Sequence, residues 1–474
     1  MHMRMQIACR YPPANMFICT TSNNPRQEMR ISRDLFKPGS AISVVTFLFL
    51  IILSNTAGAQ IKFEKSPIHY STSEPSNPIT ELIRKIDSKA VELNYTDERG
   101  YLDSLLEVLE ISTASQTLVF SKTSRQRRFI SPESPRALFF NEDVYVGWIP
   151  EGEIIEISVA DPHLGAVFYT IDQQQLTNPP KITRQLGQCL LCHASTHTDR
   201  IPGHIVRSVH TDRTGMPMLQ SVAYRTTDQS PLSERWGGWY VTGTHGEQKH
   251  MGNLWSEDSL SWLPTDEESG ANLIDLSSKF DPTPYPTSHS DIVALMVLEH
   301  QVNMHNLITA ANIEWRVYWE ERNSQRVSRE GTEAKLSEED NYRLNLIATR
   351  IVAGLLFKQE ARLTNPIQGT SQFQNEFEAK GPFDSQGRSL RQFDLTNRLF
   401  KYPCSYLIYS KSFRELPEDL LNAIINQLKL TLNTSEDNDN FQIPIPQRQT
   451  IWNILKETQK ELPKTWHPHF NPKP

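Results

Sequence analysis

The sequence predicts an α+β fold, with a strand-rich middle region and a helical C-terminal region. Between Ala137 and Asp172, short β-branched and aromatic runs alternate with turn residues, which is typical of strands joined by hairpins. After Asp291, apolar residues recur at helical spacing over long stretches. Because 38% of the 474 residues are hydrophobic and 30 are proline, we expect a real core surrounded by long polar loops.

A short apolar run near the N-terminus indicates a secretory signal. Residues 41–53 (AISVVTFLFLIIL) are too few for a membrane span of about 20 residues, but they fit a signal-peptide core of about 7–15. Basic residues precede this run and small residues follow it: Arg30, Arg33, Lys37, Ala57, Gly58 and Ala59. We expect a charged region that begins at Met29, cleavage before Gln60 and no stable membrane span afterwards. An uncleaved anchor is the alternative.

Cleavage would leave few cysteines in an exported chain. Cys9 and Cys19 lie upstream of the expected cut, so Cys189, Cys192 and Cys404 remain. Export implies an oxidising compartment, and an odd count then means that at least one cysteine is not in an intrachain disulfide. Cys404 lies in an apolar aromatic run and is expected to be a free buried thiol. The expected location of the protein is periplasmic or secreted.

The expected elements follow in order along the mature chain. Residues 60–78 are polar and rich in turn formers, which predicts a linker, and residues 101–111 place leucines on one helical face. Four runs then predict strands: 137–140, 144–149, 153–159 and 166–171. A second hairpin is expected over residues 205–225.

Helices are expected to dominate the rest of the chain. Residues 291–321 predict one long helix capped by Asp291 or Ser290. The charged segments 320–341 and 367–389 predict solvated connections. Further amphipathic helices are expected after Pro417 and over residues 451–462. The predicted organisation is a signal peptide with an upstream extension (1–59), a mixed α+β region (60–285) and a mainly helical region (286–474).

The strongest motif in the chain is C-x-x-C-H, formed by Cys189, Cys192 and His193. Two thiols at this spacing can reach the two vinyl groups of one haem, and the adjacent histidine can bind the iron as proximal ligand. The motif therefore predicts one covalently attached haem c. Export agrees with this prediction, because haem of this type is attached outside the cytoplasm.

Three other uses of the motif are weaker. These are a Cys189–Cys192 disulfide, a thioredoxin-like redox pair and half of a zinc site. A zinc site would need a second ligand pair, but Cys404 has no partner cysteine nearby in the sequence. A thioredoxin-like pair should lie between a strand and a helix, whereas two prolines at 179–180 precede this motif and a polar loop follows it.

With this motif, the sequence resembles the c-type cytochromes. Three flanking segments are also similar to a family of exported, single-haem, cytochrome-c-domain proteins of environmental bacteria: RALFFNEDVYVGW (136–148), TDQSPLSERWGGWYVTGTHG (227–246) and RLFKYPCSYLIYS (398–410). The resemblance implies that residues 60–285 form a haem-binding cytochrome c region and that the function is electron transfer. It departs from the small all-helical cytochromes, since residues 205–225 predict a hairpin.

The ligands of the iron are only partly fixed by the sequence. We expect Nδ1 of His193 to donate to a backbone carbonyl. In small c-type cytochromes a proline shortly after the motif supplies this carbonyl, and Pro202 is similarly placed, although an ordinary loop proline is the alternative. For the sixth ligand we select Met251, 58 residues after His193, a separation similar to that in Met-ligated family members. A packing role for Met251 is the alternative.

Other side chains compete as sixth ligand. The remaining candidates are His204, His210, Met216, Met218, His245, His250, His300 and Met304. His300 shares one helical face with Met296 and Met304 in a run that must be buried. A core histidine satisfied by a neighbouring carboxylate is the alternative for His300.

Basic and aromatic residues near the motif could complete a haem pocket. Arg207, Arg225 and Arg235 are candidate partners for the haem propionates. Trp236, Trp239 and Tyr240 are candidate pocket walls. Ordinary sheet packing explains these residues equally well.

The sequence therefore predicts an exported monohaem c-type cytochrome that exchanges electrons with redox partner proteins. Nucleic acid is not an expected partner, because the chain is acidic, with a net charge of −7. The mature chain is about four times the size of a single-domain carrier. This excess keeps a second class open: a haem enzyme or sensor, peroxidase-like or binding a small ligand at an open distal site. Catalysis is undecided, and electron transfer is preferred.

Overall fold

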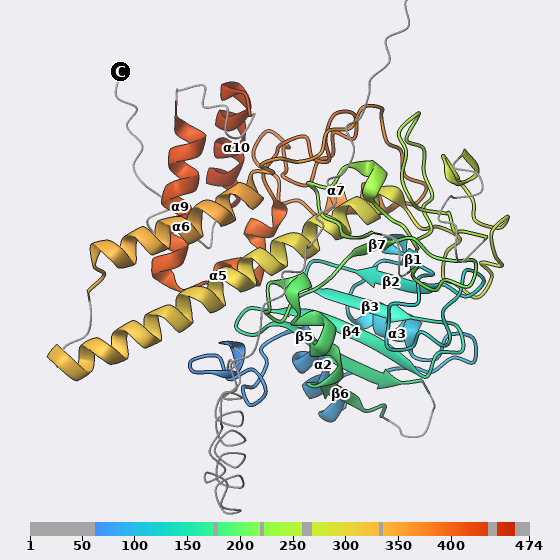
Figure 1. Ribbon diagram of the computed structural model, residues 1–474, viewed down its shortest axis with the longest axis horizontal. Coiled ribbons are helices and arrows are strands. Elements are labelled where there is room, and N and C mark those ends of the chain that lie inside the picture. Colours follow the sequence, from blue (N-terminus) through green and yellow to red (C-terminus); the bar gives the residue numbers. More distant parts are fainter. Residues whose placement is uncertain are drawn as a thin grey trace, which may run out of the picture. The chain divides into compact units, whose positions relative to one another are not determined.

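The strands lie in the middle of the sequence and the long helices follow them, which confirms the α+β prediction (Figure 1). The computed structural model describes residues 62–173, 179–218, 222–257, 268–330, 335–434 and 443–459, with the side chains of 326–330 left out. The expected signal peptide, its cleavage site and residues 1–59 lie outside the described residues.

Six strands form one antiparallel sheet in which each strand pairs with the next in sequence. They are β1 (Thr117–Val119), β2 (Arg136–Phe140), β3 (Val144–Trp148), β4 (Ile154–Asp161), β5 (Gly165–Asp172) and β6 (Ile182–Gln185). A separate two-stranded ribbon consists of β7 (Arg207–Val209) and β8 (Ala223–Arg225). Strands β2 to β5 agree with the four predicted runs, and the ribbon corresponds to the predicted second hairpin.

Side chains alternate between the two faces of the sheet, and the two faces differ in polarity. One face is apolar: Val146 on β3 lies opposite Ile157 on β4, and both belong to a core cluster with the short helices α2 and α3. The other face carries Tyr145, Ser158 and Phe168 in register across three strands. This second, more polar face receives the C-x-x-C-H segment.

The helices have the following bounds: α2 (Pro78–Asp87), α3 (Leu102–Val108), α4 (Gln188–His193), α5 (Ile292–Glu330), α6 (Glu338–Leu355), α7 (Phe373–Ala379), α8 (Lys411–Arg414), α9 (Glu418–Asn433) and α10 (Ile445–Thr458). Short 3₁₀ turns occur at Lys62–Glu64, Thr113–Ser115, Thr196–Thr198, Leu232–Glu234, Glu268–Gly270 and Tyr406–Tyr409. No helix in the part of the chain described here is both long and apolar enough to cross a membrane.

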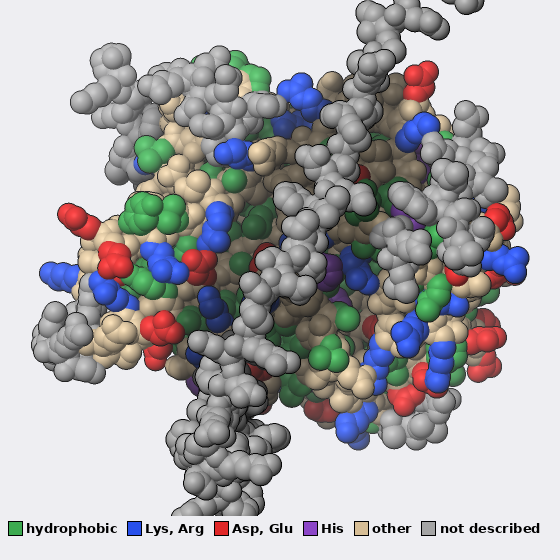
Figure 2. Space-filling model, in the orientation of Figure 1, with side chains coloured by type: hydrophobic (Ala, Val, Ile, Leu, Met, Phe, Trp, Pro, Cys, Tyr) green, Lys and Arg blue, Asp and Glu red, His purple; other side chains and the backbone are tan. Residues whose placement is uncertain are grey.

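Helix α5 begins in the core, and several of its residues between 320 and 325 are exposed. Asp291 caps it, accepting the backbone N–H groups of Val293 and Ala294, and residues 292–298 are all buried. Farther along, Glu314 forms ion pairs with Arg343 and Arg350 of α6. Figure 2 shows side chains of both charge signs interspersed over this part of the surface. Segment 320–341, expected to be a connection, instead contributes the end of α5 and the start of α6.

Candidate functional site

The C-x-x-C-H motif lies on the short helix α4, which is poorly covered by protein. None of its six residues is buried. Cys189 is half-buried and Cys192 exposed, and both are free thiols. Because residues three apart on a helix lie on the same side, the two sulfur atoms can reach one common ligand. Leu191, between them, is 78% exposed, so the helix presents apolar surface as well as thiols.

His193 ends α4 with one ring nitrogen held by the backbone. Its Nδ1 lies 2.9 Å from the carbonyl oxygen of Gly203, which can only accept, so Nδ1 carries the proton. The Gly203 N–H donates in return to the His193 carbonyl at 2.8 Å. Loss of hydration around its half-buried side chain lowers the pKa of His193 from its ordinary value. The ring is therefore neutral at pH 7, with the lone pair of Nε2 available to a metal ion.

The carbonyl that accepts the hydrogen bond from His193 belongs to Gly203 and not, as predicted, to Pro202. The carbonyl of Pro202 accepts the backbone N–H of Ala166 at 3.0 Å, so it points to the sheet and not to His193. Asn306 of α5 holds the next residues in place, since its side chain accepts from the N–H of His204 and donates to the His204 carbonyl, both at 2.8 Å. A Cβ on Gly203 would lie 2.5 Å from Oδ1 of Asn306, which explains the glycine.

Charged groups from the sheet surround the motif. Arg136 and Glu156 form an ion pair at 2.7 Å, and both act electrostatically on His193. Burial raises the pKa of the Cys189 thiol and nearby Glu156 adds to the rise, while Arg125 opposes it. Arg136 and Glu156 lie on β2 and β4, and Arg125 lies in the loop between β1 and β2. All three are more than 30 residues from the motif in sequence, and the sequence analysis did not find them.

The three arginines expected near the haem propionates have different environments. Arg207 is half-buried and lowers the pKa of His193, so it lies near the motif. Arg225 pairs with Asp199 at 3.6 Å, six residues beyond the motif. Arg235 is buried and forms an ion pair with Glu299 at 2.9 Å, so its charge is already compensated inside the core. Trp236 and Tyr240 are also fully buried, which agrees with ordinary packing, the alternative to a role as walls of a haem pocket.

Met251 lies on the other side of the β7–β8 ribbon from the residues that face the motif. Its sulfur accepts the hydroxyl of Ser208 at 3.5 Å, and Ser208 pairs with Tyr224 in the ribbon. Neighbouring residues on a strand point to opposite faces, and the adjacent pair Arg207 and Arg225 is the one near the motif. No contact found among the described residues joins Met251 to His193, so the sixth-ligand assignment stays a prediction.

The histidines considered as alternatives already have hydrogen-bond partners. Nδ1 of His250 accepts the N–H of Gly252 at 3.0 Å, and Nε2 of His245 accepts the N–H of Asn272 at 3.0 Å. His300 lies between Ser405, 2.8 Å from its Nε2, and Asp228, 3.5 Å from its Nδ1. His300 is therefore buried beside a carboxylate, which agrees in part with the alternative considered for it, but its Nδ1 makes no hydrogen bond among the described residues.

Two buried histidines, the sixth-ligand candidate His204 and His305, lie on the polar face of the sheet that also contacts the motif. Nδ1 of His204 is 2.8 Å from the hydroxyl of Ser158, and Nδ1 of His305 is 2.9 Å from the hydroxyl of Tyr145. The two imidazole centroids are 5.7 Å apart. His305 comes from α5, more than 100 residues after the motif, and no sequence pattern connects it with His204.

The described residues contain no group of three or more His, Cys, Asp or Glu side chains arranged to hold a metal ion. A comparison of this chain with protein family models, curated proteins and solved structures found no match. The assignment of the site therefore depends on the chemistry of these residues themselves.

Proposed function

We propose that this protein is an exported c-type cytochrome with a single haem, which passes electrons between partner proteins. One observation carries the proposal: α4 presents two free thiols on one side, directly before a histidine whose Nδ1 donates to the Gly203 carbonyl. The thiols are what covalent haem attachment requires, and the free Nε2 is what an iron ligand requires.

The surroundings of α4 support the same proposal. A short helix with no buried residue and a leucine that is 78% exposed leaves apolar surface next to the thiols. A haem face would cover such a surface. Large exposed apolar side chains are informative when they adjoin a candidate binding group, because isolated ones are common.

Each residue would have a defined role. Cys189 and Cys192 would hold the haem through thioether bonds, and His193 would bind the iron through Nε2. The Gly203 carbonyl fixes the ring orientation of His193 and increases its basicity. Arg125 and Arg207 are the cationic groups near the motif that could pair with propionates. Haem bound there supplies a one-electron ferric–ferrous couple.

The alternative, a haem enzyme or sensor with an open distal site, is favoured by a different observation. Three of the side chains considered as sixth ligand have other contacts: Met251 with Ser208, His250 with Gly252, and His300 with Ser405 and Asp228. An iron with only His193 as protein ligand would leave one position for a small molecule.

The test of haem attachment is a denaturing gel stained for haem after periplasmic expression with a cytochrome c maturation system. The wild-type protein is expected to retain haem through denaturation, and the double variant Cys189→Ser/Cys192→Ser is expected to lose it completely. The matched control is Cys404→Ser, since this thiol is buried far along the chain and should not affect staining. Absence of covalent haem in the wild-type protein would refute the proposal.

The visible spectrum separates the two classes. A low-spin, six-coordinate spectrum that does not change with CO supports electron transfer, and Met251→Ala should then convert it to high spin. A high-spin spectrum with rapid CO binding would instead support the enzyme or sensor class. A low-spin spectrum unaffected by Met251→Ala would exclude Met251 as the ligand.

A further inference from the structure

The peptide group between Gly203 and His204 is held from both sides by side chains. Its carbonyl oxygen accepts the Nδ1–H of His193 at 2.9 Å, and its N–H, which belongs to His204, donates to Oδ1 of Asn306 at 2.8 Å. In a trans peptide the C=O and the N–H point in opposite directions within one plane, so His193 and Asn306 lie on opposite sides of the same group. The position of Asn306 therefore decides where the carbonyl that holds the motif histidine points.

Asn306 contacts this segment at two points. Besides accepting from the N–H of His204, it donates through Nδ2 to the carbonyl oxygen of His204, also at 2.8 Å. The side chain comes from α5 and is only 4% exposed, so water competes little for these hydrogen bonds. One hydrogen bond would let the peptide group rotate about the contact, whereas two fix its orientation.

The close contact with Asn306 requires glycine at position 203. A Cβ there would lie 2.5 Å from Oδ1 of Asn306 and 3.1 Å from Cβ of Thr198. Thr198 is fully buried, and its hydroxyl lies 3.0 and 2.8 Å from the carbonyl oxygens of His193 and Ile201. Packed side chains therefore adjoin Gly203 on two sides, and its carbonyl has little freedom to move.

A hydrogen bond from Nδ1 affects how strongly an imidazole donates electrons through Nε2. An accepting carbonyl fixes the Nδ1–H tautomer and raises the basicity of Nε2 as a ligand. The N–H of the same peptide group is hydrogen-bonded to Asn306, which polarises the carbonyl and strengthens its hydrogen bond with His193. Electron donation from the ligand stabilises ferric iron relative to ferrous iron, and hydrogen bonding around a ligand is one of the means by which a protein sets a reduction potential.

We propose that Asn306 is a positioning residue for the iron ligand: it holds the peptide between Gly203 and His204 so that His193 keeps the Nδ1–H tautomer, and it thereby lowers the reduction potential of the haem. The role assigned to Asn306 rests on the proposed haem function.

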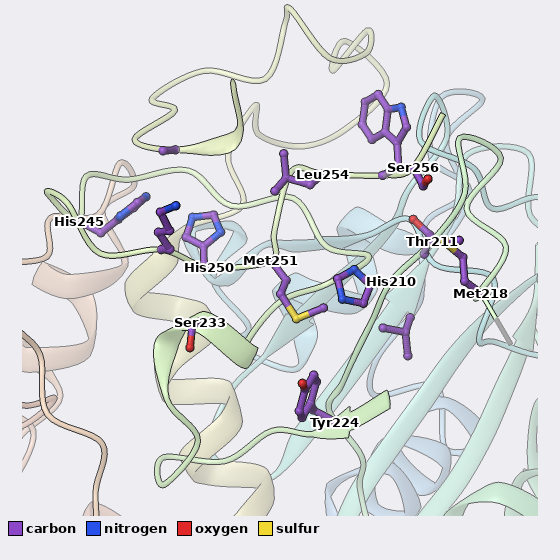
Figure 3. Close-up of a pocket in the computed structure, with 14 residues that line it drawn as sticks. His210, Thr211, Met218, Tyr224, Ser233, His245, His250, Met251, Leu254 and Ser256 are labelled. Atoms are coloured by element: carbon purple, nitrogen blue, oxygen red, sulfur yellow. The ribbon is translucent and has the colours of Figure 1, made fainter. Parts of the chain in front are cut away.

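The candidate sixth ligand lies in different surroundings. Met251 lines a cavity of about 500 Å³ together with His210 (Figure 3). Neither Gly203 nor Asn306 is among the residues that line this cavity. A substitution at either position therefore tests the His193 side without removing a group that lines the cavity around Met251.

The first test is the reduction potential of the haem-loaded protein, measured by spectroelectrochemical titration. Asn306→Ala removes both hydrogen bonds to His204, and Gly203→Ala displaces the same peptide group by steric contact without a substitution in α5. Loss of an outer hydrogen-bond partner typically changes the properties of a metal site about 10–100-fold. We expect each variant to shift the ferric–ferrous equilibrium about tenfold towards the ferrous state, which raises the potential by about 59 mV.

Asn312→Ala is the matched control for the loss of a buried asparagine from α5. Asn312 is 3% exposed, and its Nδ2 donates to the backbone carbonyl of Pro162. This variant removes a comparable buried hydrogen bond, but Pro162 lies outside the loop that holds His193. The potential should therefore equal that of the wild type. Circular dichroism of each variant verifies the fold.

The second test needs no haem. In the full mature chain with Cys189→Ser and Cys192→Ser, NMR of the imidazole nitrogens reports the tautomer of His193, whose signals are identified by their loss in His193→Ala. We expect the Nδ1–H tautomer alone when Asn306 is present, and a mixture of both tautomers after Asn306→Ala.

The outcomes separate the role of Asn306 from the proposed function. Absence of covalent haem from the wild-type protein refutes the proposed function and with it the effect on the potential, whereas the tautomer test still decides whether Asn306 positions His193. Covalent haem with an unchanged potential in folded Asn306→Ala and Gly203→Ala proteins overturns the role of Asn306 alone. An equal shift in Asn312→Ala, or an unaltered tautomer after Asn306→Ala, overturns it as well.

Discussion

Asp143, at the turn between β2 and β3, shows how one buried carboxylate makes the stability of the fold depend on pH. Its Oδ1 is buried without a hydrogen-bond partner among the described residues. Burial raises its pKa from 3.8 to about 6, the negative charge of Glu142 adds to the rise, and Lys411 and Arg414 oppose it. The folded protein therefore keeps a proton on Asp143 at pH values where the unfolded chain has lost it.

This difference predicts the effect of Asp143→Asn on stability. As pH rises from about 4 to about 6, the unfolded state binds fewer protons than the folded state, so the wild type loses stability, and the loss persists above pH 6. The variant lacks this charge and should be more stable by about 2–3 kcal/mol at pH 7, with the difference vanishing near pH 4. Urea unfolding at several pH values measures it.

Asp87→Asn removes an exposed carboxylate at the end of α2 and is the control for a simple change of net charge. A constant stability difference between wild type and Asp143→Asn from pH 4 to pH 7 would contradict the account given for Asp143.

At the residue scale, local sequence identified the residues of the motif but not their environment. Cys189, Cys192 and His193 lie close together in sequence, and the structure places them on the short helix α4, which the sequence analysis does not predict. Their attachment to haem stays a prediction. The carbonyl that holds His193 was assigned to Pro202, because the sequence does not show that Asn306 clamps the loop and directs Gly203 to the ring. That contact joins segments about 100 residues apart.

At the scale of elements, the start of α5 is fixed by one side chain with four hydrogen bonds. Oδ1 of Asp291 accepts the N–H groups of Val293 and Ala294 at 2.8 and 3.2 Å. Oδ2 accepts those of Thr370 and Ser371 at 2.7 and 2.8 Å. The carboxylate therefore caps the helix and also ties it to a loop almost 80 residues later. The sequence predicted the cap, but it did not predict the hydrogen bonds from Thr370 and Ser371 to the same carboxylate.

Asp291→Ala should therefore lower the free energy of unfolding by more than the loss of an ordinary helix cap does. Removing a typical N-cap costs about 1 kcal/mol, whereas each buried donor left unpaired costs about 1–3 kcal/mol. We expect a loss of about 3–4 kcal/mol for Asp291→Ala and a smaller loss for Asp291→Asn, which keeps one acceptor oxygen. Ser337→Ala, at the partly exposed cap of α6, is the matched comparison, with an expected loss of about 1 kcal/mol. Equal losses for Asp291→Ala and Ser337→Ala would contradict the double role of Asp291.

The prediction of secondary structure and packing was wrong in two segments whose residues are mostly polar but which also have buried apolar side chains. Segment 320–341 is rich in charges, yet its residues 338–341 begin α6, on which Leu344 and Ile347 are buried. Likewise, residues 60–78 were expected to be a linker, yet Phe63, Ile68 and Tyr70 are buried in the core of the sheet region. A few apolar residues among many polar ones give only a weak periodic pattern in the sequence. Whether these residues are buried is decided by the part of the fold against which they pack.

At the scale of the whole molecule, α5 runs between the sheet and the helices α6 and α9 (Figure 1), and its residues belong to two hydrophobic clusters. Ile308 and Trp315 pack in the cluster formed with α6, α9 and α10, whereas Ile313 and Val317 pack in the cluster of the sheet with α2 and α3. The two sets alternate along a single helix, so neither cluster keeps its buried surface if α5 unfolds. The predicted boundary at residue 285 stays untested, but the core shared along α5 opposes independent folding of the two regions.

The shared helix predicts one cooperative unfolding transition for the described part of the chain. Ile308→Ala and Ile313→Ala each leave a cavity and should each cost about 2–5 kcal/mol, although they lie in different clusters. Because α5 supplies both clusters, each variant should lower the temperature of the same transition in differential scanning calorimetry. Independent folding would instead give two transitions, with Ile308→Ala moving one and Ile313→Ala the other. If the transition is shared, the whole of α5 unfolds as one unit. Loss of packing around α9, far from the motif, would then also destabilise the hydrogen bond between Asn306 and the loop that positions His193.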